Sequence, residues 1–211
     1  MVLRARNLST VAKVSMSNPR IRIKSVDTLS RRWGTLTSTR LDYRRADGRW
    51  EEQVREVYDH GHGAAIIPYD PERGTVLLVR QFRYVAHLVG GVGEMIEACA
   101  GLLDADDPEG CIRREAMEEL GVRLRDVHLL FTAYSSPGSL TERISLFAGH
   151  YVPADRVAPG GGHADEGEDI DVLEWTLDEA LAAMRSGRIV DMKTILLLQH
   201  LELERSGEHS G

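Results

Sequence analysis

The stretch REAMEEL, residues 114–120, places three glutamates within a single short segment. On a helix, Glu115, Glu118 and Glu119 stand at i, i+3 and i+4, so their side chains lie on one face. Like charges at this spacing repel each other, and spacing alone therefore favours an exposed charged helix face. A hard divalent cation such as Mg²⁺, which prefers carboxylate oxygens and waters, would offset that repulsion and is the alternative.

The helix that carries these glutamates is predicted to begin at Asp107 and to end at Gly121. Asp107 suits the N-cap because its carboxylate can accept hydrogen bonds from the first free backbone N–H groups. Pro108 suits the first helical position, and Gly121 suits the left-handed residue that follows a last helical turn. Both ends of the helix are therefore marked by local sequence.

The rest of the chain alternates between strand and helix patterns. Strands are predicted in IRIKSV (21–26), WGTLTSTRLDYRR (33–45), EEQVREVYDHG (51–61), AAIIPYD (64–70), TVLLVRQF (75–82), VHLLFTAY (127–134), ISLFAGHYV (144–152) and IDVLEWT (170–176). Two further helices are predicted in LDEALAAMRSG (177–187) and DMKTILLLQHLELE (191–204). The fold class is α/β, with a small antiparallel β extension in the N-terminal third.

The charge of the chain is unevenly distributed. The 211 residues carry a net charge of −7, yet residues 1–26 contain six basic residues and no acid, which leaves −7 − 6 = −13 for the remainder. A body this acidic is a poor nucleic-acid binder, because phosphate backbones require a basic face. It can still bind a small molecule that carries phosphates, provided that cations or local arginines screen the charge.

The composition also indicates the cellular compartment of the protein. No apolar run approaches the roughly 18 residues of a membrane-spanning helix, so no membrane partner is expected. Cys99 and Cys111 are too few for a disulfide framework, which favours a reducing cytoplasm. His60 and His62 lack the additional cysteine or histidine partners of a zinc site, and turn or surface roles are expected for them.

The basic N-terminal tail, residues 1–19, has two interpretations. It is either an organelle transit peptide or a disordered tail that includes an upstream start, in which case Met16 is the initiator. No convincing amphipathic periodicity supports the transit peptide, so the second interpretation is favoured.

The segment from Gly101 to Val122 resembles the Nudix box, whose pattern is G-x5-E-x7-R-E-U-x-E-E-x-G-U, where U is aliphatic. The closing part, REAMEELGV, matches in register. The spacing from Gly101 to Arg114 is one residue shorter than the pattern, and Asp106 or Asp107 stands where the early glutamate is expected. That early acid belongs mainly to the loop and the helix cap. Its replacement is therefore not expected to change the metal-binding face of the helix.

Other segments are similar to one branch of the Nudix hydrolases, the GDP-mannose pyrophosphatases, which also has the shortened box. The resemblance covers roughly residues 25 to 204 and rests on REVYDHGHGAAI, LVRQFR, IEACAGLLD, CIRREAMEELG, YSSPGSLTE, PGGG, EDIDVLEW and KTILLL. It implies a Nudix fold, a mixed β-sheet sandwiched between helices. The expected domains are a β-strand dimerisation region at 20–58 and a Nudix hydrolase domain at 59–206.

The resemblance implies a metal site on the box helix. In this family the box glutamates bind Mg²⁺, or Mn²⁺, so Glu115 and Glu119 are the implied ligands, and Glu118 contributes directly or through water. The main-chain carbonyl of Ala100 is a further implied ligand. Arg114 is expected to support the glutamates by salt bridges.

A second acid is expected from the loop GGGHADEGEDI, which contains Asp165, Glu166, Glu168 and Asp169. Alignment backwards from EDI favours Glu168 as the residue that binds metal and orients or deprotonates the attacking water. Glu166 stays open because the loop is slightly longer than in relatives. A flexible acidic surface loop with no catalytic part is the competing interpretation.

The resemblance also implies substrate contacts. The matching positions are Trp33, Arg55, Glu56, Arg83, Glu142 and Lys193. Trp33 falls where relatives stack an aromatic ring on the nucleobase, and a buried strand tryptophan is the competing explanation. Arg83 and Lys193 suit a diphosphate because each supplies donors and positive charge.

The implied activity is Mg²⁺-dependent hydrolysis of a nucleoside diphosphate sugar, with GDP-mannose giving GMP and mannose 1-phosphate. Glu119 is expected to be essential for turnover. An ADP-ribose pyrophosphatase, giving AMP and ribose 5-phosphate, is the enzymatic alternative, and a non-catalytic nucleotide-sugar sensor is the alternative of another class. The family also implies a homodimer with exchanged N-terminal strands.

Overall fold

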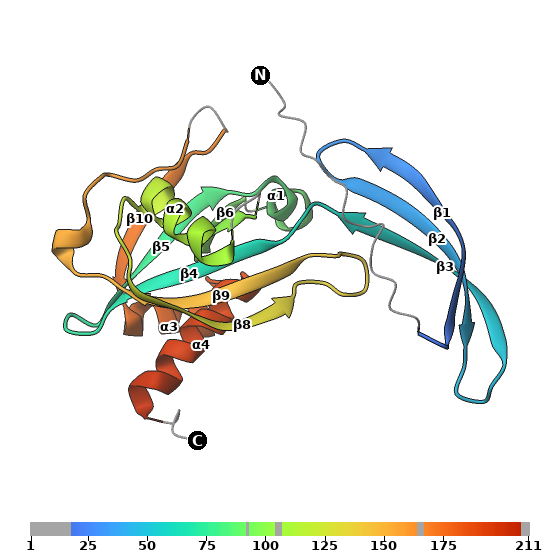
Figure 1. Ribbon diagram of the computed structural model, residues 1–211. Helices are drawn as coiled ribbons and strands as arrows, with labels where there is room; N and C mark the ends of the chain where they lie inside the picture. Colours follow the sequence, from blue (N-terminus) through green and yellow to red (C-terminus); the bar gives the residue numbers. More distant parts are fainter. Residues whose placement is uncertain (1–17, 92, 104–106, 164–166, 208–211) are drawn as a thin grey trace. The chain divides into compact units, whose positions relative to one another are not determined.

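The computed structural model describes residues 18–91, 93–103, 107–163 and 167–207 (Figure 1). Most of the tail predicted at 1–19 lies outside the described residues, as do Asp106, Asp165 and Glu166. The chain divides into two compact units. The N-terminal unit comprises the described parts of Met1–Gly61 and Tyr134–Glu142, and the main unit comprises the described parts of His62–Ala133 and Arg143–Gly211.

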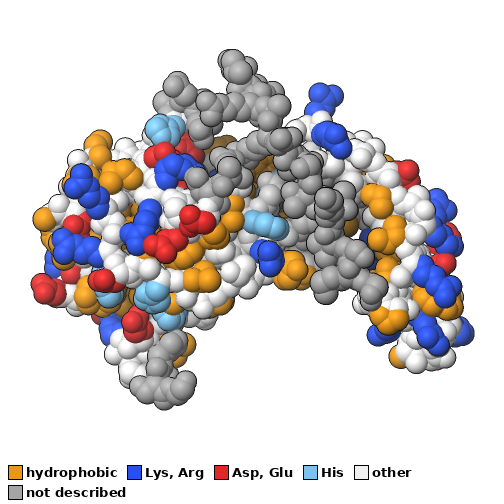
Figure 2. Space-filling view, viewed as in Figure 1, with side chains coloured by type: hydrophobic (Ala, Val, Ile, Leu, Met, Phe, Trp, Pro, Cys, Tyr) orange, Lys and Arg blue, Asp and Glu red, His pale blue; other side chains and the backbone are white. Residues whose placement is uncertain are grey.

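The N-terminal unit is built on an antiparallel sheet of the strands β1 (Ile21–Arg31), β2 (Thr35–Arg44) and β3 (Trp50–Asp59). The predicted turn at ADGRW joins β2 to β3, and Gly48 within it has a φ of +87°, which glycine adopts without strain. The predicted N-terminal antiparallel extension is therefore confirmed. Figure 2 shows hydrophobic and basic side chains side by side on its surface.

The main unit contains a mixed sheet whose strand order, within the described residues, is β10-β5-β4-β9-β8. Its strands are β4 (Gly63–Asp70), β5 (Thr75–Phe82), β8 (Arg125–Tyr134), β9 (Arg143–His150) and β10 (Ile170–Thr176). Strand β4 runs parallel to β9 and antiparallel to β5. Only Tyr69 and Asp70 of β4 pair with β5, next to the turn that joins these two strands.

Two short strands pair with β4 and β5 beyond the point where those strands separate. Strand β6 (Glu94–Glu97) pairs with β5, and β7 (Cys99–Leu102) pairs with β4. The sequence analysis did not predict them, nor the helix α1 (Tyr84–Gly90) and the short 3-10 helix η1 (Pro153–Asp155). All four are short, and α1 buries none of its side chains, so they carry little periodic signal.

Helices cover both faces of the central sheet (Figure 1). Alternate residues of the central strands belong to two separate core clusters, one for each layer of helices. Ala64 and Ile66 of β4 pack in one cluster with α2 (Pro108–Leu120). Ala65 and Ile67 pack in the other with α3 (Leu177–Arg185) and α4 (Met192–Ser206). The predicted mixed sheet sandwiched between helices is therefore confirmed.

The ends of α2 lie where the sequence placed them. The Asp107 side chain accepts hydrogen bonds from the backbone N–H groups of Glu109 and Gly110, at 3.0 and 2.9 Å. Gly121 has a φ of +66°, the left-handed conformation typical of the residue after a last turn. Among the described residues, no helix is long and apolar enough to cross a bilayer.

The N-cap of α2 leads to a stability prediction. Replacement of Asp107 by Ala removes the acceptor for two N–H groups and should lower the free energy of unfolding by about 1 kcal/mol. Asn preserves the acceptor, so Asp107→Asn should retain most of the stability. Urea denaturation monitored by circular dichroism measures both, and an equal loss in the two variants would contradict a capping role.

Candidate functional site

The acidic face of α2 is directed into the protein. Glu115 and Glu119 are only 9% and 2% exposed, and Glu118 is half-buried. An exposed charged helix would place these carboxylates in water, so that interpretation of the spacing is wrong. The burial of two carboxylates on one helix has an electrostatic cost that calls for nearby positive charge.

Gly101 lets this helix approach strand β7. A Cβ atom on Gly101 would lie 2.2 Å from the Oε1 atom of Glu115, far inside van der Waals contact. The Glu115 carboxylate thus occupies the space that any other residue would fill with its side chain. A side chain at position 101 would therefore force Glu115 out of this position.

Glu119 is held by the backbone and side chain of the same strand. Its Oε2 atom accepts a hydrogen bond from the Ala100 N–H at 3.2 Å, and the Cys99 thiol donates another to its carboxylate. Burial raises the pKa of Glu119 to about 7, with Glu115 and Glu168 adding to the rise, while the bonds from Cys99 and Ala100 oppose it. Its negative charge is therefore only partly compensated within the protein.

Arg114 partly offsets the charge of the other two acids. Its guanidinium lies 2.9 Å from Glu115 and 2.8 Å from Glu118, which is the supporting contact expected for it. Burial nevertheless raises the pKa of Glu115, and the charges of Glu118 and Glu168 act in the same direction. Arg114 therefore lowers the pKa of Glu115 by less than burial and the neighbouring acids raise it.

The PGGG loop binds the C-terminal end of α2. The N–H groups of Gly161 and Gly162 donate to the carbonyls of Glu119 and Glu118, at 2.9 and 3.1 Å. These carbonyls have no partner inside the helix, so the loop satisfies them. A Cβ on Gly160 would lie only 2.4 Å from the Glu119 carbonyl oxygen, so a side chain there would separate the loop from the helix.

This docking brings Glu168 to the acidic face. Its carboxylate accepts a hydrogen bond from the His163 N–H at 2.9 Å, and the His163 ring lies 3.4 Å from Glu118. Its charge raises the pKa of both Glu115 and Glu119. The loop therefore contacts the acidic helix through His163 and Glu168, and its catalytic part stays a prediction. Glu166, the other candidate, lies outside the described residues.

The donor set fits a hard divalent cation, since it consists of carboxylates with one main-chain carbonyl available at Ala100. In the part of the chain that the structure describes, no three acidic, histidine or cysteine side chains lie close enough together to hold a metal ion as they stand. Glu115 and Glu118 are oriented towards Arg114, which accounts for this. Metal binding therefore requires these two side chains to turn away from the arginine.

Two basic side chains, one directly after β5 and one in the first turn of α4, meet at a buried carboxylate. Arg83 and Lys193 both bind Glu97, a carboxylate that the sequence analysis did not single out. Glu97 lies at the end of β6 and is 2% exposed. No periodic pattern marks Glu97. A glutamate between the apolar residues Ile96 and Ala98 is nevertheless unusual and is the signal that could have identified it.

The remaining predicted substrate residues lie in the N-terminal unit. Trp33 is 56% exposed in the bend after β1, so the alternative of a buried strand tryptophan is wrong. One face of its ring stacks on His60, with centroids 5.1 Å apart. Arg55 and Glu56 are exposed on β3, and Glu142 is half-buried, 4.0 Å from His60.

His60 and His62 lie in the connection between β3 and β4. The side chain of His60 is only 12% exposed and packs against Trp33 and Tyr58. His62 accepts a hydrogen bond from the Arg143 N–H at 3.2 Å. Cys99 and Cys111 are buried and form no disulfide.

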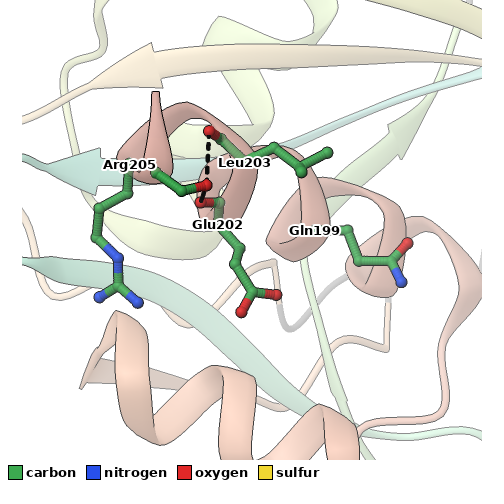
Figure 3. A pocket seen from close by; sticks show the side chains of 5 residues that line it. Gln199, Glu202, Leu203 and Arg205 are labelled. Carbon is green, nitrogen blue, oxygen red and sulfur yellow. Dashed lines mark hydrogen bonds between the residues drawn. The ribbon is translucent and has the colours of Figure 1, made fainter. Parts of the chain in front are cut away.

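A surface hollow of about 620 Å³ lies elsewhere, along the last turns of α4 (Figure 3). It is lined by Gln199, Glu202, Leu203, Arg205 and Ser206. None of the predicted site residues belongs to it, and the Glu202 carboxylate is already paired with Arg185. The hollow therefore has no acid cluster comparable to that of α2.

Two family models match the chain. Residues 20–58 match the GDP-mannose pyrophosphatase NudK N-terminal domain, and residues 59–191 match the NUDIX domain. The second match alone spans more than half of the chain. It includes the whole acidic helix and the loop that contacts it.

Individual proteins are similar over most of their length. A GDP-mannose pyrophosphatase from Pectobacterium atrosepticum is 49% identical over 186 residues, which cover 88% of this chain and 95% of the relative. One from Cronobacter sakazakii is 48% identical over 176 residues, covering 83% and 91%. The crystal structure of an ADP compounds hydrolase shares the fold, with a TM-score of 0.70, 19% identity and coverage of 90% and 96%.

The contact between the PGGG loop and α2 is testable with a matched pair of variants. Gly160 and Gly187 have nearly equal φ angles of +73° and +76°, but a Cβ on Gly187 would meet no atom within 4 Å. Alanine should therefore cost about 1 kcal/mol of backbone strain at either position, and more at Gly160 because of the clash with Glu119. Urea denaturation measures the difference.

Amide hydrogen exchange tests the same contact directly. Exchange at Gly161 and Gly162 should accelerate in Gly160→Ala and stay unchanged in Gly187→Ala, because only the first variant breaks their bonds to α2. Equal unfolding free energies and equal exchange in the two variants would show that the loop does not depend on this approach.

Proposed function

Because the chain belongs to the Nudix hydrolase family, we propose that it hydrolyses the diphosphate bond of GDP-mannose, releasing GMP and mannose 1-phosphate. One observation carries the reaction type. Two buried carboxylates of α2 lie near a third acid from the PGGG loop, and burial together with the repulsion among these acids raises the pKa of both α2 carboxylates. The substrate is supported by the two relatives of 48% and 49% identity.

Nudix hydrolases generally use divalent metal ions, and we propose Mg²⁺ for this chain, with Mn²⁺ as a substitute. The ion would be held by four carboxylates and one main-chain carbonyl, namely Glu115, Glu118, Glu119, Glu168 and the carbonyl of Ala100. When bound, such an ion neutralises phosphate charge and lowers the pKa of a water molecule. The partly uncompensated charge of Glu115 and Glu119 supports this assignment.

The side chains of the protein then perform the remaining tasks. Glu168 orients the attacking water and accepts its proton, while Glu166 is the alternative base. The water oxygen bonds to one phosphorus, and the bridging P–O bond breaks so that the departing phosphate takes the electron pair. Arg83 and Lys193 bind phosphate oxygens and keep the diphosphate in line for attack.

The N-terminal unit supplies recognition of the nucleoside. The exposed face of Trp33 stacks on the base, a contact of about 1–3 kcal/mol, and His60 supports its other face. Arg55, Glu56 and Glu142 provide further polar contacts to the substrate.

We further propose that the enzyme is a cytoplasmic homodimer that exchanges its N-terminal strands. Strand β1 exposes several large hydrophobic side chains, Ile21, Ile23, Val26 and Leu29, which is unfavourable for an isolated sheet. Two buried cysteines that form no disulfide are consistent with a reducing compartment. The domain organisation would then be a dimerisation region at 20–58 followed by the hydrolase domain at 59–206.

Replacement of Glu119 by Gln tests the catalytic assignment. The amide keeps the size of the side chain and can still accept from the Ala100 N–H, so the fold should persist. Turnover with Mg²⁺ should fall at least about 100-fold, because several kcal/mol of charge stabilisation are lost. Glu109→Gln is the matched control, since Glu109 is an exposed acid on the same helix, paired with Arg113; near-normal activity of Glu119→Gln would contradict the assignment.

A substrate panel tests specificity. The kcat/KM for GDP-mannose should exceed that for ADP-ribose, with GMP and mannose 1-phosphate identified by chromatography. A preference for ADP-ribose would favour the second enzymatic activity. Tight binding of GDP-mannose without any product after prolonged incubation with Mg²⁺ would instead indicate a sensor.

Light scattering tests the oligomeric state. The protein should have the mass of a dimer, and Ile23→Glu combined with Leu29→Glu should shift it towards the monomer and reduce activity, because an apolar interface does not tolerate unpaired charges. A fully active monomer of the unmodified chain would contradict the exchanged dimer.

A further inference from the structure

Glu97 connects two cations that are far apart in the sequence. Its Oε1 atom accepts from Nε of Arg83 at 2.7 Å, and its Oε2 atom accepts from Nη2 of Arg83 at 3.0 Å and from Nζ of Lys193 at 2.6 Å. Arg83 follows strand β5, whereas Lys193 lies in the first turn of α4. One buried carboxylate thus sets the separation of both cationic groups.

The same segment fixes the start of α4 by a second contact. The N–H of Ala98, next to Glu97, donates to Oγ1 of Thr194 at 2.7 Å. Thr194 in turn donates to Asp191, the N-cap of α4, whose other oxygen accepts from Lys193 at 2.9 Å. The position of Lys193 is therefore determined by the bend between β6 and β7.

Of the three side chains, Glu97 is the most buried and Arg83 the most exposed. The side chains of Glu97 and Lys193 are 3% and 13% exposed, whereas that of Arg83 is 44% exposed. Glu97 occupies two of the five guanidinium N–H donors of Arg83. The remaining donors lie on a partly exposed group whose orientation is fixed by the buried bidentate pair, a geometry suited to a phosphate oxygen.

Building on the proposed function, we propose that Glu97 is a positioning residue that holds Arg83 and Lys193 as one paired contact for the substrate diphosphate. It stands three residues before Ala100 and on the segment that also borders the acidic helix. The acidic and basic halves of the site are thereby fixed relative to one short piece of backbone. Substitution at Glu97 then changes substrate binding through Arg83 and Lys193 without a contact of its own.

A purely structural ion pair is the competing explanation. Buried pairs contribute little net stability, and loss of one partner is costly wherever the pair lies. Glu174 is a matched control, because it accepts from Arg73 at 2.5 Å and from Arg156 at 3.4 Å in the same unit. It stands opposite Leu77, about 20 Å along the strand from Arg83.

Steady-state kinetics with GDP-mannose separates the two explanations. Glu97→Gln should raise KM about tenfold, the factor for one weakened charge-assisted hydrogen bond, with a smaller change in kcat. Glu97→Asp, which preserves the buried charge and therefore the fold, should raise KM in the same direction. Glu174→Gln should lower the melting temperature but leave KM unchanged.

A mutant cycle tests whether Glu97 acts through its two partners. In an Arg83→Gln and Lys193→Gln background, Glu97→Gln should cause no further rise in KM, because the groups that it positions are gone. An unchanged KM in both single Glu97 variants, or an equal rise in the presence and absence of the two cations, would overturn the positioning role.

Titration calorimetry distinguishes failure of this inference from failure of the proposed function. Inorganic pyrophosphate, added in the absence of metal, should bind the unmodified protein more tightly than Glu97→Gln or Glu97→Asp, whatever nucleotide sugar the enzyme hydrolyses. Equal affinity would overturn the positioning role even if GDP-mannose is turned over. An inactive but pyrophosphate-binding protein would contradict only the proposed function.

Discussion

The close approach of helix α2 to strand β7 is the constraint on which the rest of the site depends. Gly101 has no side chain, and the carboxylate of Glu115 lies where its Cβ would be. The acidic face is thereby pressed against the sheet, which buries Glu119 and raises its pKa to about 7, since burial disfavours its charge. The packing of α2 on one face of the sheet thus also leaves buried carboxylates whose negative charge a cation would stabilise.

The segment from β6 to β7 relates the two halves of the site. On one side, the Ala100 N–H and the Cys99 thiol hold Glu119. On the other side, Glu97 holds Arg83 and Lys193. Because β6 and β7 pair with β5 and β4 in the centre of the unit, this segment has little freedom to move. The contacts of Glu119 and those of Arg83 and Lys193 are therefore carried by the same short piece of backbone.

Local signals were sufficient for much of the fold. The cap of α2 at Asp107, its end at Gly121 and the apolar strands were predicted because hydrogen-bond capping, left-handed glycine and alternation are properties of neighbouring residues. Strands β6 and β7 were missed, since they are short and exist only through pairing with longer strands. The stacking of Trp33 on His60 was not predicted, because the two residues are distant in sequence.

The sequence by itself determined that three glutamates share one helix face and that a glycine-rich loop follows. Both features depend only on residues that are close together in the chain. Only the tertiary structure decided that this face is buried, that the loop binds its end, and that Glu97 joins Arg83 to Lys193. Burial and ion pairing depend on which distant segments pack together, and no local pattern in one chain encodes those neighbours.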